Sequence, residues 1–365
     1  MKINRQARRL WLMAIGMWAA LSAPSPFALA AESVSDRLAE INRLEPAQRK
    51  KRLEEGAKKE GELILYASEN LNLISDYEKA FAKRYPFLKL KYWRAGGDKV
   101  GARVLTEIRA NKLEADLIGI AFDVVTEIEK TGVFASYLSP ERKFLSNSLR
   151  DKRGHYNPTH VIYAVIAYNT NLVSAKEAPT DYPDLLDPKW SGSLTIDAEP
   201  SRAVMGWLKA WGEEKTRRYA QGLARNGVKI NRGHTLQTQL LCAGEHKIAV
   251  ELYLYTASQM RRAGCPLAIV YPNPVPVASA QSWGITTKAA HPHAAALFVD
   301  YLLSLEAGQL VASRGRAPAR SDVEMSDREA VNLKSVAARF EFLSPEDATQ
   351  LRDATARIVK EFSQR

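Results

Sequence analysis

ELILYASENLNLISDYEKAFAKRYPFLKLKYWRA, residues 62–95, holds the pattern from which the fold can be predicted. It opens with a short apolar run that ends in small polar residues, which is typical of a buried strand. Apolar residues at helical spacing follow, and Pro86 closes that helix. Over residues 88–95, apolar and polar residues alternate as in a second strand. Two strands joined by a helix predict a parallel sheet that is covered by helices.

The same alternation extends along the chain. A helical pattern over residues 97–112, a strand pattern over 115–120 and a helical pattern over 123–132 follow directly. A second series begins near residue 155 with the long apolar stretch "HVIYAVIAYNTN". The fold class is therefore α/β.

Residues 1–30 have the features of a secretory signal peptide. "MKINRQARR" is basic, "LWLMAIGMWAAL" is apolar but short for a membrane span, and Ala28 to Ala30 form a small-x-small cleavage site. A membrane anchor is the alternative. No cysteine follows the cleavage site, which argues against a lipid anchor. We expect a soluble periplasmic protein of about 335 residues, enough for two domain cores.

The charge of the chain is modest once the leader is removed. Its four basic residues account for part of the formal net charge of +11, which falls to +7 without them. Positive and negative residues are interspersed, and no basic run of the kind that binds nucleic acid is present. We expect no nucleic-acid partner.

Cys242 and Cys265 are the only cysteines. In an oxidising compartment they could form a disulfide. They could equally be two separate buried thiols, because the sequence does not give their separation.

No standard catalytic motif is found in the sequence. A nucleotide-binding loop and a G-x-S-x-G motif are both missing, and "HPH" at residues 291–293 is a weak basis for a metal site. We expect no enzyme activity and no cofactor, although a secreted enzyme stays open as an alternative. A sensory ligand-binding domain is a further alternative, but it would need an attached DNA-binding or membrane segment.

Several stretches resemble one protein family in content and order. These are "YASENL", "HVIYAVIAYNTNLV", "APTDYPDLLDPKWSGSLTI", "RGHTLQTQLLCAGE" and "LFVDYLLSLEAGQ", within residues 60–325. They resemble the periplasmic solute-binding proteins of ABC importers, in the group described as iron(III)-transport-type. The resemblance implies a two-lobed periplasmic binding protein fold of type II, with the ligand cleft between the lobes.

The resemblance also implies boundaries and partners. The first lobe would comprise residues 31–154 and about 280–365, and the second lobe residues 155–279, with hinge crossings between them. The partners would be a small-molecule ligand and the membrane permease of an ABC importer, and the protein would be a monomer. Hinge closure on the ligand is the motion expected of such a protein.

Ligands of open α/β sheets bind at the carboxyl ends of strands, where loops lead into helix N-termini. That rule predicts ligand-binding positions without reference to a family. They are Ser68, Glu69, Arg94, Gly97, Asp98, Phe122, Asp123, Glu199, Arg202, Arg232, His234, Thr235, Glu251, Tyr253, Tyr255, Ser279 and Trp283.

Three of these residues bear on ferric iron. The resemblance implies that iron-binding members carry two adjacent tyrosines where this chain reads "ELYLY", so that Leu254 replaces one of them. Glu251, Tyr253 and Tyr255 would be the ligands if iron is bound, but a single matching phenolate is a poor start for Fe(III). Arg94, Arg202 and Arg232 at the ligand loops favour instead a small anionic or zwitterionic organic solute.

Secretion can be tested by N-terminal sequencing of the protein from a periplasmic extract. The first residue is expected to be Ala31, because cleavage should follow the small-x-small site. An intact Met1 in a membrane fraction would contradict this expectation.

Overall fold

The computed structural model of this chain describes residues 32–272, 275–324 and 340–363. The predicted signal peptide, residues 1–30, lies outside the described residues. The rest belongs to one compact unit, Ser33–Arg365, in which helices and strands alternate.

Up to residue 149, the helices and strands are α1 (Val34–Arg43), α2 (Pro46–Glu60), β1 (Glu62–Ala67), α3 (Leu71–Arg84), β2 (Lys89–Arg94), α4 (Gly97–Arg109), β3 (Leu117–Ala121), α5 (Phe122–Glu129), and the 3-10 helices η1 (Pro140–Phe144) and η2 (Asn147–Leu149). From residue 157 onward they are β4 (Asn157–Asn169), η3 (Tyr182–Leu186), η4 (Pro188–Trp190), β5 (Leu194–Asp197), α6 (Ser201–Arg225), β6 (Lys229–Asn231), α7 (His234–Ala243), β7 (Ile248–Tyr253), α8 (Leu254–Arg262), β8 (Leu267–Val270), β9 (Val275–Ile285), α9 (Pro292–Leu302), α10 (Leu305–Ser313), β10 (Ala317–Pro318), β11 (Phe340–Phe342), α12 (Pro345–Gln350) and α13 (Arg352–Ser363).

The predicted parallel arrangement is present in two groups of strands. In the first group, β1 lies between β2 and β3 and runs parallel to both, with Ala67 opposite Arg94 and Gly119. In the second, β5 lies between β6 and β7 and runs parallel to both. In each group the carboxyl ends of the strands therefore lie at one edge of the sheet.

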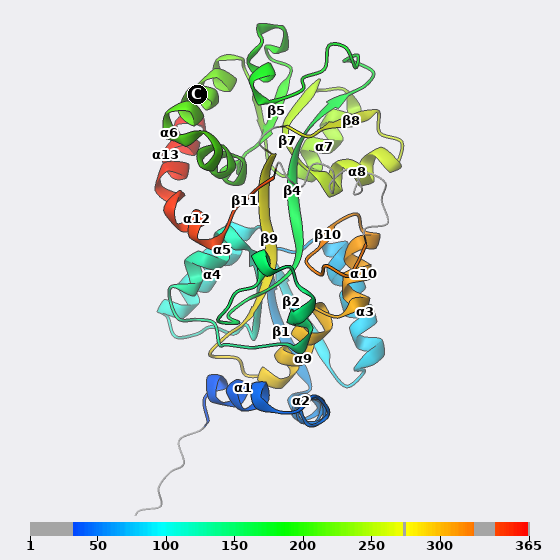
Figure 1. Cartoon of the computed structure of the whole chain (residues 1–365), viewed down its shortest axis with the longest axis vertical. Helices are drawn as coiled ribbons and strands as arrows, with labels where there is room; N and C mark the ends of the chain where they lie inside the picture. Colours follow the sequence, from blue (N-terminus) through cyan, green and yellow to red (C-terminus); the bar gives the residue numbers. More distant parts are fainter. Residues whose placement is uncertain (1–31, 273–274, 325–339, 364–365) are drawn as a thin grey trace, which may run out of the picture. The chain divides into compact units, whose positions relative to one another are not determined.

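Two long strands, β4 and β9, connect the groups. They pair antiparallel along the first half of β4, with His160 opposite Gln281 (Figure 1). β9 also pairs with β3 of the first group, and the second half of β4 pairs with β7 and β8. β9 thus joins the first group directly and β4 joins the second, and because β9 also contacts α6, the paired strands cross from one half of the fold to the other.

Two lobes follow from the distribution of the buried apolar residues. One large cluster joins the first strand group with α1 to α5, α9 and α10, and we call this part the first lobe. Two further clusters join the second strand group with α6, α7 and α8, and we call this part the second lobe.

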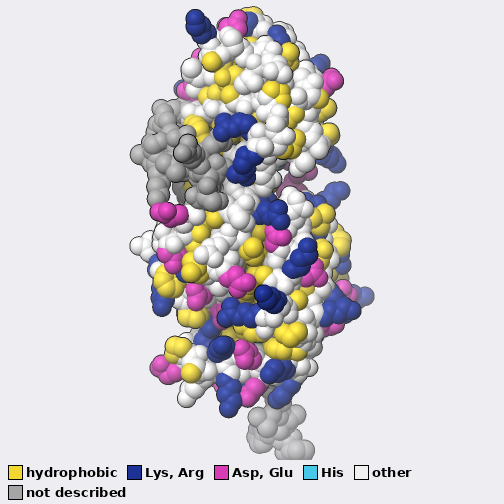
Figure 2. All heavy atoms as spheres, turned by 90° about the vertical axis from the view of Figure 1, so that its right-hand side faces the viewer, with side chains coloured by type: hydrophobic (Ala, Val, Ile, Leu, Met, Phe, Trp, Pro, Cys, Tyr) yellow, Lys and Arg dark blue, Asp and Glu magenta, His cyan; other side chains and the backbone are white. Residues whose placement is uncertain are grey.

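On the face shown in Figure 2, acidic and basic side chains are interspersed, in keeping with the modest net charge.

The C-terminal helix lies elsewhere than the sequence prediction placed it. All residues after about 280 were expected in the first lobe, but α13 packs against α6, and its Ile358 belongs to the second-lobe core. Arg357 of α13 and Glu213 of α6 form an ion pair, with Nη2 and Oε1 3.1 Å apart. The apolar face of α13 thus covers α6.

Trp283 and Gly119 form a cross-strand pair between β9 and β3. A Cβ atom at position 119 would lie 2.5 Å from the indole ring, so only glycine leaves room for it. Trp283 is 1% exposed and packs on Phe298 of α9, with 6.1 Å between the ring centroids. The structure thus places Trp283 in the first-lobe core, not in the ligand site where the sequence prediction put it.

A disulfide joins Cys242 at the end of α7 to Cys265 just before β8. The bond therefore ties together the two ends of a segment that contains β7 and α8.

Among the described residues, no single helix is long and apolar enough to cross a membrane. One pair, Pro292–Leu302 and Leu305–Ser313, reaches that length and composition together but is bent by 59°.

Replacing Cys242 and Cys265 together by serine is expected to lower the free energy of unfolding by about 3 kcal/mol, because the bond restricts the unfolded chain across the loop that it closes. The measurement is equilibrium denaturation of the oxidised wild type and the double variant, with reduced wild type as the control that should match the variant. Equal midpoints for oxidised wild type and variant would speak against a stabilising bond.

Candidate ligand-binding site

A cavity of about 640 Å³ lies where the strand ends of the two lobes face each other. Its walls come from the loops that follow β1, β2, β5, β6 and β7, and its floor comes from the crossing strands β4 and β9. The residues that line it are Ser68, Glu69, Asn70, Arg94, Gly96, Gly97, Asp98, Lys99, His160, Ile162, Asp197, Glu199, Ser201, Arg202, Arg232, Gly233, His234, Thr235, Leu236, Gln239, Tyr253, Tyr255 and Gln281.

Four helices begin at this cavity without a side-chain cap. The residues at the N-termini of α4, α6, α7 and α8 line it, and none of these helices has a side-chain hydrogen bond to its first N–H groups. A fifth helix at the cavity, α3, is capped by the side chain of Asn70, and away from the cavity α1, α10 and α12 are capped by serine side chains whereas α2, α5 and α9 have no side-chain cap. Uncapped N-termini carry partial positive charge and N–H donors, so they suit anionic oxygens.

Asp197 at the end of β5 holds two of the cavity loops in place. Its Oδ1 accepts a hydrogen bond from the N–H of Glu199 at 2.8 Å, and its Oδ2 accepts one from the N–H of Gly233 at 2.7 Å. These bonds fix the segments that lead to Arg202 and Arg232. Burial raises the pKa of Asp197, and the two N–H donors and the two arginines act against that rise.

An aromatic group forms the second-lobe wall. The rings of His234 and Tyr253 lie 3.6 Å apart between centroids, and those of Tyr253 and Tyr255 lie 5.7 Å apart. Arg202 donates a hydrogen bond to the hydroxyl of Tyr253. The Tyr255 ring is covered by the guanidinium of Arg316, with Cζ 4.0 Å from the ring centroid.

Behind this wall lies the buried carboxyl group of Glu251, which is 1% exposed. Its Oε1 is 3.9 Å from Nε2 of His234. Burial, and then the nearby Asp197, raise the pKa of Glu251 from 4.5 to about 8. Burial, and then Arg202, lower the pKa of His234 from 6.5 to about 3. At neutral pH both side chains are therefore mainly uncharged.

The floor of the cavity carries buried polar groups. Glu69, His160 and Gln281 are at most 3% exposed. One oxygen of Glu69 accepts a hydrogen bond from the N–H of Asn70 at 2.8 Å, whereas Oε2 of Glu69 and Nε2 of Gln281 have no hydrogen-bond partner. Buried Arg316 lies 3.9 Å from Glu69 and offsets its negative charge.

Most of the residues predicted from the sequence come together in this cavity. They are Ser68, Glu69, Arg94, Gly97, Asp98, Glu199, Arg202, Arg232, His234, Thr235, Tyr253 and Tyr255. The strand-end rule located them because the carboxyl ends of both strand groups face the same space.

Other predicted residues lie outside the lining. Phe122 is the first residue of α5, and its ring is buried against Tyr156, with centroids 5.5 Å apart. Trp283 fills the space above Gly119, and Glu251 is covered by His234. The side chains of Asp123 and Ser279 are outside the described part of the structure.

Several residues of the cavity were missed by the sequence prediction, and three of them, His160, Gln281 and Asp197, carry polar groups that matter for the site. His160 and Gln281 lie in the middle of long strands, where the rule for strand ends does not apply. The sequence around them, NPTHVI at residues 157–162 and ASAQSW at residues 278–283, gave no clear signal. Asp197 had a clearer signal, since it is an acidic residue that directly follows the apolar and β-branched residues of β5.

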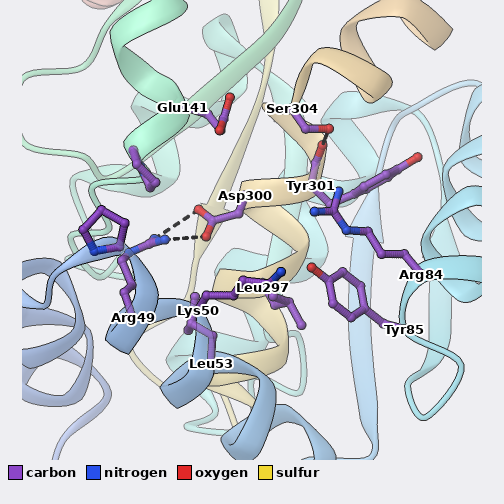
Figure 3. Close-up of a pocket in the computed structure, with 12 residues that line it drawn as sticks. Arg49, Lys50, Leu53, Arg84, Tyr85, Glu141, Leu297, Asp300, Tyr301 and Ser304 are labelled. Carbon is purple, nitrogen blue, oxygen red and sulfur yellow. Dashed lines mark hydrogen bonds and ion pairs between the residues drawn. The ribbon is translucent and has the colours of Figure 1, made fainter.

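A second, smaller cavity of about 180 Å³ lies between α2, α3 and α9 (Figure 3). Figure 3 shows Arg49 pointing at Asp300, with Nη1 2.6 Å from Oδ2. The hydroxyl of Tyr137 donates to the same carboxylate at 2.9 Å. Because these charges neutralise one another, this cavity is a weaker candidate for a charged ligand.

One group of acidic and histidine side chains is close enough to hold a metal ion, but its members already have partners within the protein. Among the residues that the structure describes, Glu129, Asp151 and His155 are the one group of three close enough to share an ion. However, Glu129 accepts a hydrogen bond from Arg153 at 2.6 Å and contacts Nδ1 of His155 at 2.8 Å. These contacts indicate a structural role, in which Glu129 holds the loop that contains Arg153 and His155 in place.

Comparison with known proteins shows the family to which this chain belongs. A family model for bacterial extracellular solute-binding proteins matches residues 116–346, which is more than half of the chain. The chain belongs to the bacterial extracellular solute-binding protein family. It is therefore a solute-binding protein of the kind that serves ABC import systems.

Individual relatives of this solute-binding protein are distant in sequence. A Haemophilus influenzae protein is 26% identical over 274 residues, which are 71% of this chain and 78% of the relative. Iron-bound HitA from Pseudomonas aeruginosa superposes with a TM-score of 0.73 at 18% identity, over 82% of this chain and 99% of that chain. AfuA from Actinobacillus pleuropneumoniae, described with exogenous fructose-6-phosphate bound, gives a TM-score of 0.70 at 20% identity, over 83% and 98%. The fold is thus that of the two-lobed periplasmic binding proteins.

Glu251→Gln is expected to change how stability depends on pH. Between pH 6.5 and 8 the folded wild type keeps a proton on Glu251, whose pKa is about 8, while the unfolded chain has released it. The free energy of unfolding of the wild type should therefore fall as pH rises, by up to about 1.4 kcal/mol per pH unit. His234, with a pKa of about 3, is neutral in both states above pH 6.5.

The measurement is urea denaturation at intervals from pH 6.5 to 8. Glu251→Gln should lose less stability than the wild type across this range. Glu214→Gln, at an exposed position on α6, is the matched control and should follow the wild type. Parallel curves for wild type and Glu251→Gln would show that the buried carboxyl group does not titrate as stated.

Proposed function

We propose that this solute-binding protein captures a small anionic or zwitterionic organic solute in the cavity between its lobes and delivers it to the membrane permease of an ABC importer. The observation that carries this proposal is the pairing of Arg202 and Arg232 with the uncapped N-termini of α6 and α7. Guanidinium groups next to helix N-termini form a favourable site for carboxylate, phosphonate or phosphate oxygens.

The neighbouring aromatic wall supports an organic ligand rather than a bare anion. Tyr253 and Tyr255 line the cavity beside Arg202. A cavity of about 640 Å³ also lies in the range that small-molecule ligands occupy. The anionic group of the solute would contact the arginines, while its carbon skeleton would lie against the rings.

Ferric iron is less well supported by the same residues. The hydroxyl of Tyr253 already accepts a hydrogen bond from Arg202, so a cation there would lie against a guanidinium. Glu251 lies behind His234 and outside the cavity lining. The distant neighbours in structure include both an iron-bound protein and one with fructose-6-phosphate bound, so both kinds of cargo occur on this fold.

The proposal also covers the compartment and the motion. A cleaved leader would release a monomeric protein into the periplasm, with no nucleic-acid partner and no catalytic role. Closure of the lobes on the solute would bend the crossing strands β4 and β9, because this strand pair links the two lobes. The lobe boundaries would then lie within these two strands.

A panel of small carboxylates, phosphonates and phosphates is expected to raise the melting temperature of the purified protein. A ligand at one hundred times its dissociation constant adds about 2.7 kcal/mol to the free energy of unfolding. Arg232→Ala should weaken binding of an active ligand by about ten- to a hundredfold, since it removes a charged hydrogen-bond donor. Arg218→Ala, at an exposed position on the same lobe, should bind normally. Equal affinities for both variants would contradict the proposed anion site.

Ferric citrate is expected to leave the protein colourless, because the hydroxyl of Tyr253 accepts a hydrogen bond from Arg202 and the ring of Tyr255 is covered by Arg316. The measurement is the visible absorption spectrum, since Fe(III)–phenolate sites absorb by charge transfer. A reddish protein that loses its colour in Tyr255→Phe would instead support iron transport.

A further inference from the structure

The floor of the cavity is built differently from its second-lobe wall. The wall offers arginines and helix N-termini, whereas the floor offers Glu69, His160 and Gln281. His160 and Gln281 are opposite each other in the β4–β9 pair, and Nδ1 of His160 is 3.8 Å from Oε2 of Glu69. His160 therefore lies next to both Glu69 and Gln281.

Two atoms of this floor have unused hydrogen-bonding capacity. Oε2 of Glu69 is an acceptor without a partner, and Nε2 of Gln281 is a donor without a partner. Both side chains are only 3% exposed. A buried polar atom without a partner typically costs about 1–3 kcal/mol, so each atom would gain from a bonding group on a ligand.

We propose that this floor binds hydroxyl groups of the solute, so that the ligand is a hydroxylated organic anion. This inference rests on the proposed function, which places the anionic group at Arg202 and Arg232. A hydroxyl donates its hydrogen to Oε2 of Glu69 and accepts a hydrogen bond from Nε2 of Gln281. A single type of ligand group thus satisfies both atoms.

An ammonium group fits this floor less well, for two reasons. It has only donors, so it leaves Nε2 of Gln281 without an acceptor. It also adds a cation where buried Arg316, 3.9 Å from Glu69, already offsets the carboxylate charge. An alkyl group would leave both polar atoms unpaired. The floor therefore distinguishes hydroxylated ligands from amino and alkyl ligands that carry the same anionic group.

Three six-carbon phosphates test this inference, namely sorbitol 6-phosphate, hexyl phosphate and 6-aminohexyl phosphate. Titration calorimetry with the full mature protein should show that sorbitol 6-phosphate binds at least about tenfold more tightly than either of the others. Gluconate and hexanoate repeat the comparison with a carboxylate as the anionic group.

Variants then assign the preference to the floor. Gln281→Leu and Glu69→Gln should each reduce the preference for sorbitol 6-phosphate over hexyl phosphate by at least about threefold. Gln309→Leu, at an exposed position on α10, is the matched control and should keep the wild-type preference. Circular dichroism confirms that each variant is folded.

The outcomes separate this inference from the function on which it rests. Equal binding of the hydroxylated and alkyl ligands would overturn the inference but leave the anion site intact. Tighter binding of 6-aminohexyl phosphate would overturn it in favour of a zwitterionic ligand. If neither the phosphates nor the carboxylates bind, the proposed function fails and the inference falls with it. A preference that survives in Gln281→Leu and in Glu69→Gln would also overturn the assignment.

Discussion

The antiparallel pairing of β4 with β9 is the constraint on which the rest of the structure depends. Each lobe has its own parallel strands, but both sets join to this pair. The pair therefore sets the distance between the two rows of strand ends, and it supplies the floor between them through His160 and Gln281. Any relative movement of the lobes has to be absorbed by the same two strands.

The polarity of the cavity follows from this topology together with a few buried acids. Parallel strands followed by helices direct several helix N-termini into one space, which makes the walls favourable for anions. Asp197 accepts hydrogen bonds from two loops and so fixes the arginines that these loops carry. Glu69 and Glu251 lie deeper, and burial raises the pKa of both. Arginines and helix N-termini therefore face the cavity, while the buried carboxyl group of Glu251 lies behind its wall.

Local sequence patterns were sufficient to predict the strands, the helices and the residues at strand ends, such as Arg232 and His234. These features depend on the spacing of neighbouring residues. His160 and Gln281 could not be found in this way, because their place in the cavity depends on the register between strands far apart in the chain. Phe122 was misplaced because the direction of its side chain depends on where α5 begins. The position of α13 on α6 likewise depends on long-range packing of an apolar helix face.

The close contact between Gly119 and Trp283 has a consequence for evolution of the sequence. Any side chain at position 119 would collide with the indole ring, so a change there requires a smaller residue at position 283. Conversely, a smaller residue at 283 would leave a void in the first-lobe core unless position 119 gained volume. The two positions should therefore covary among relatives, and a member of the family with alanine or valine at 119 should lack the tryptophan.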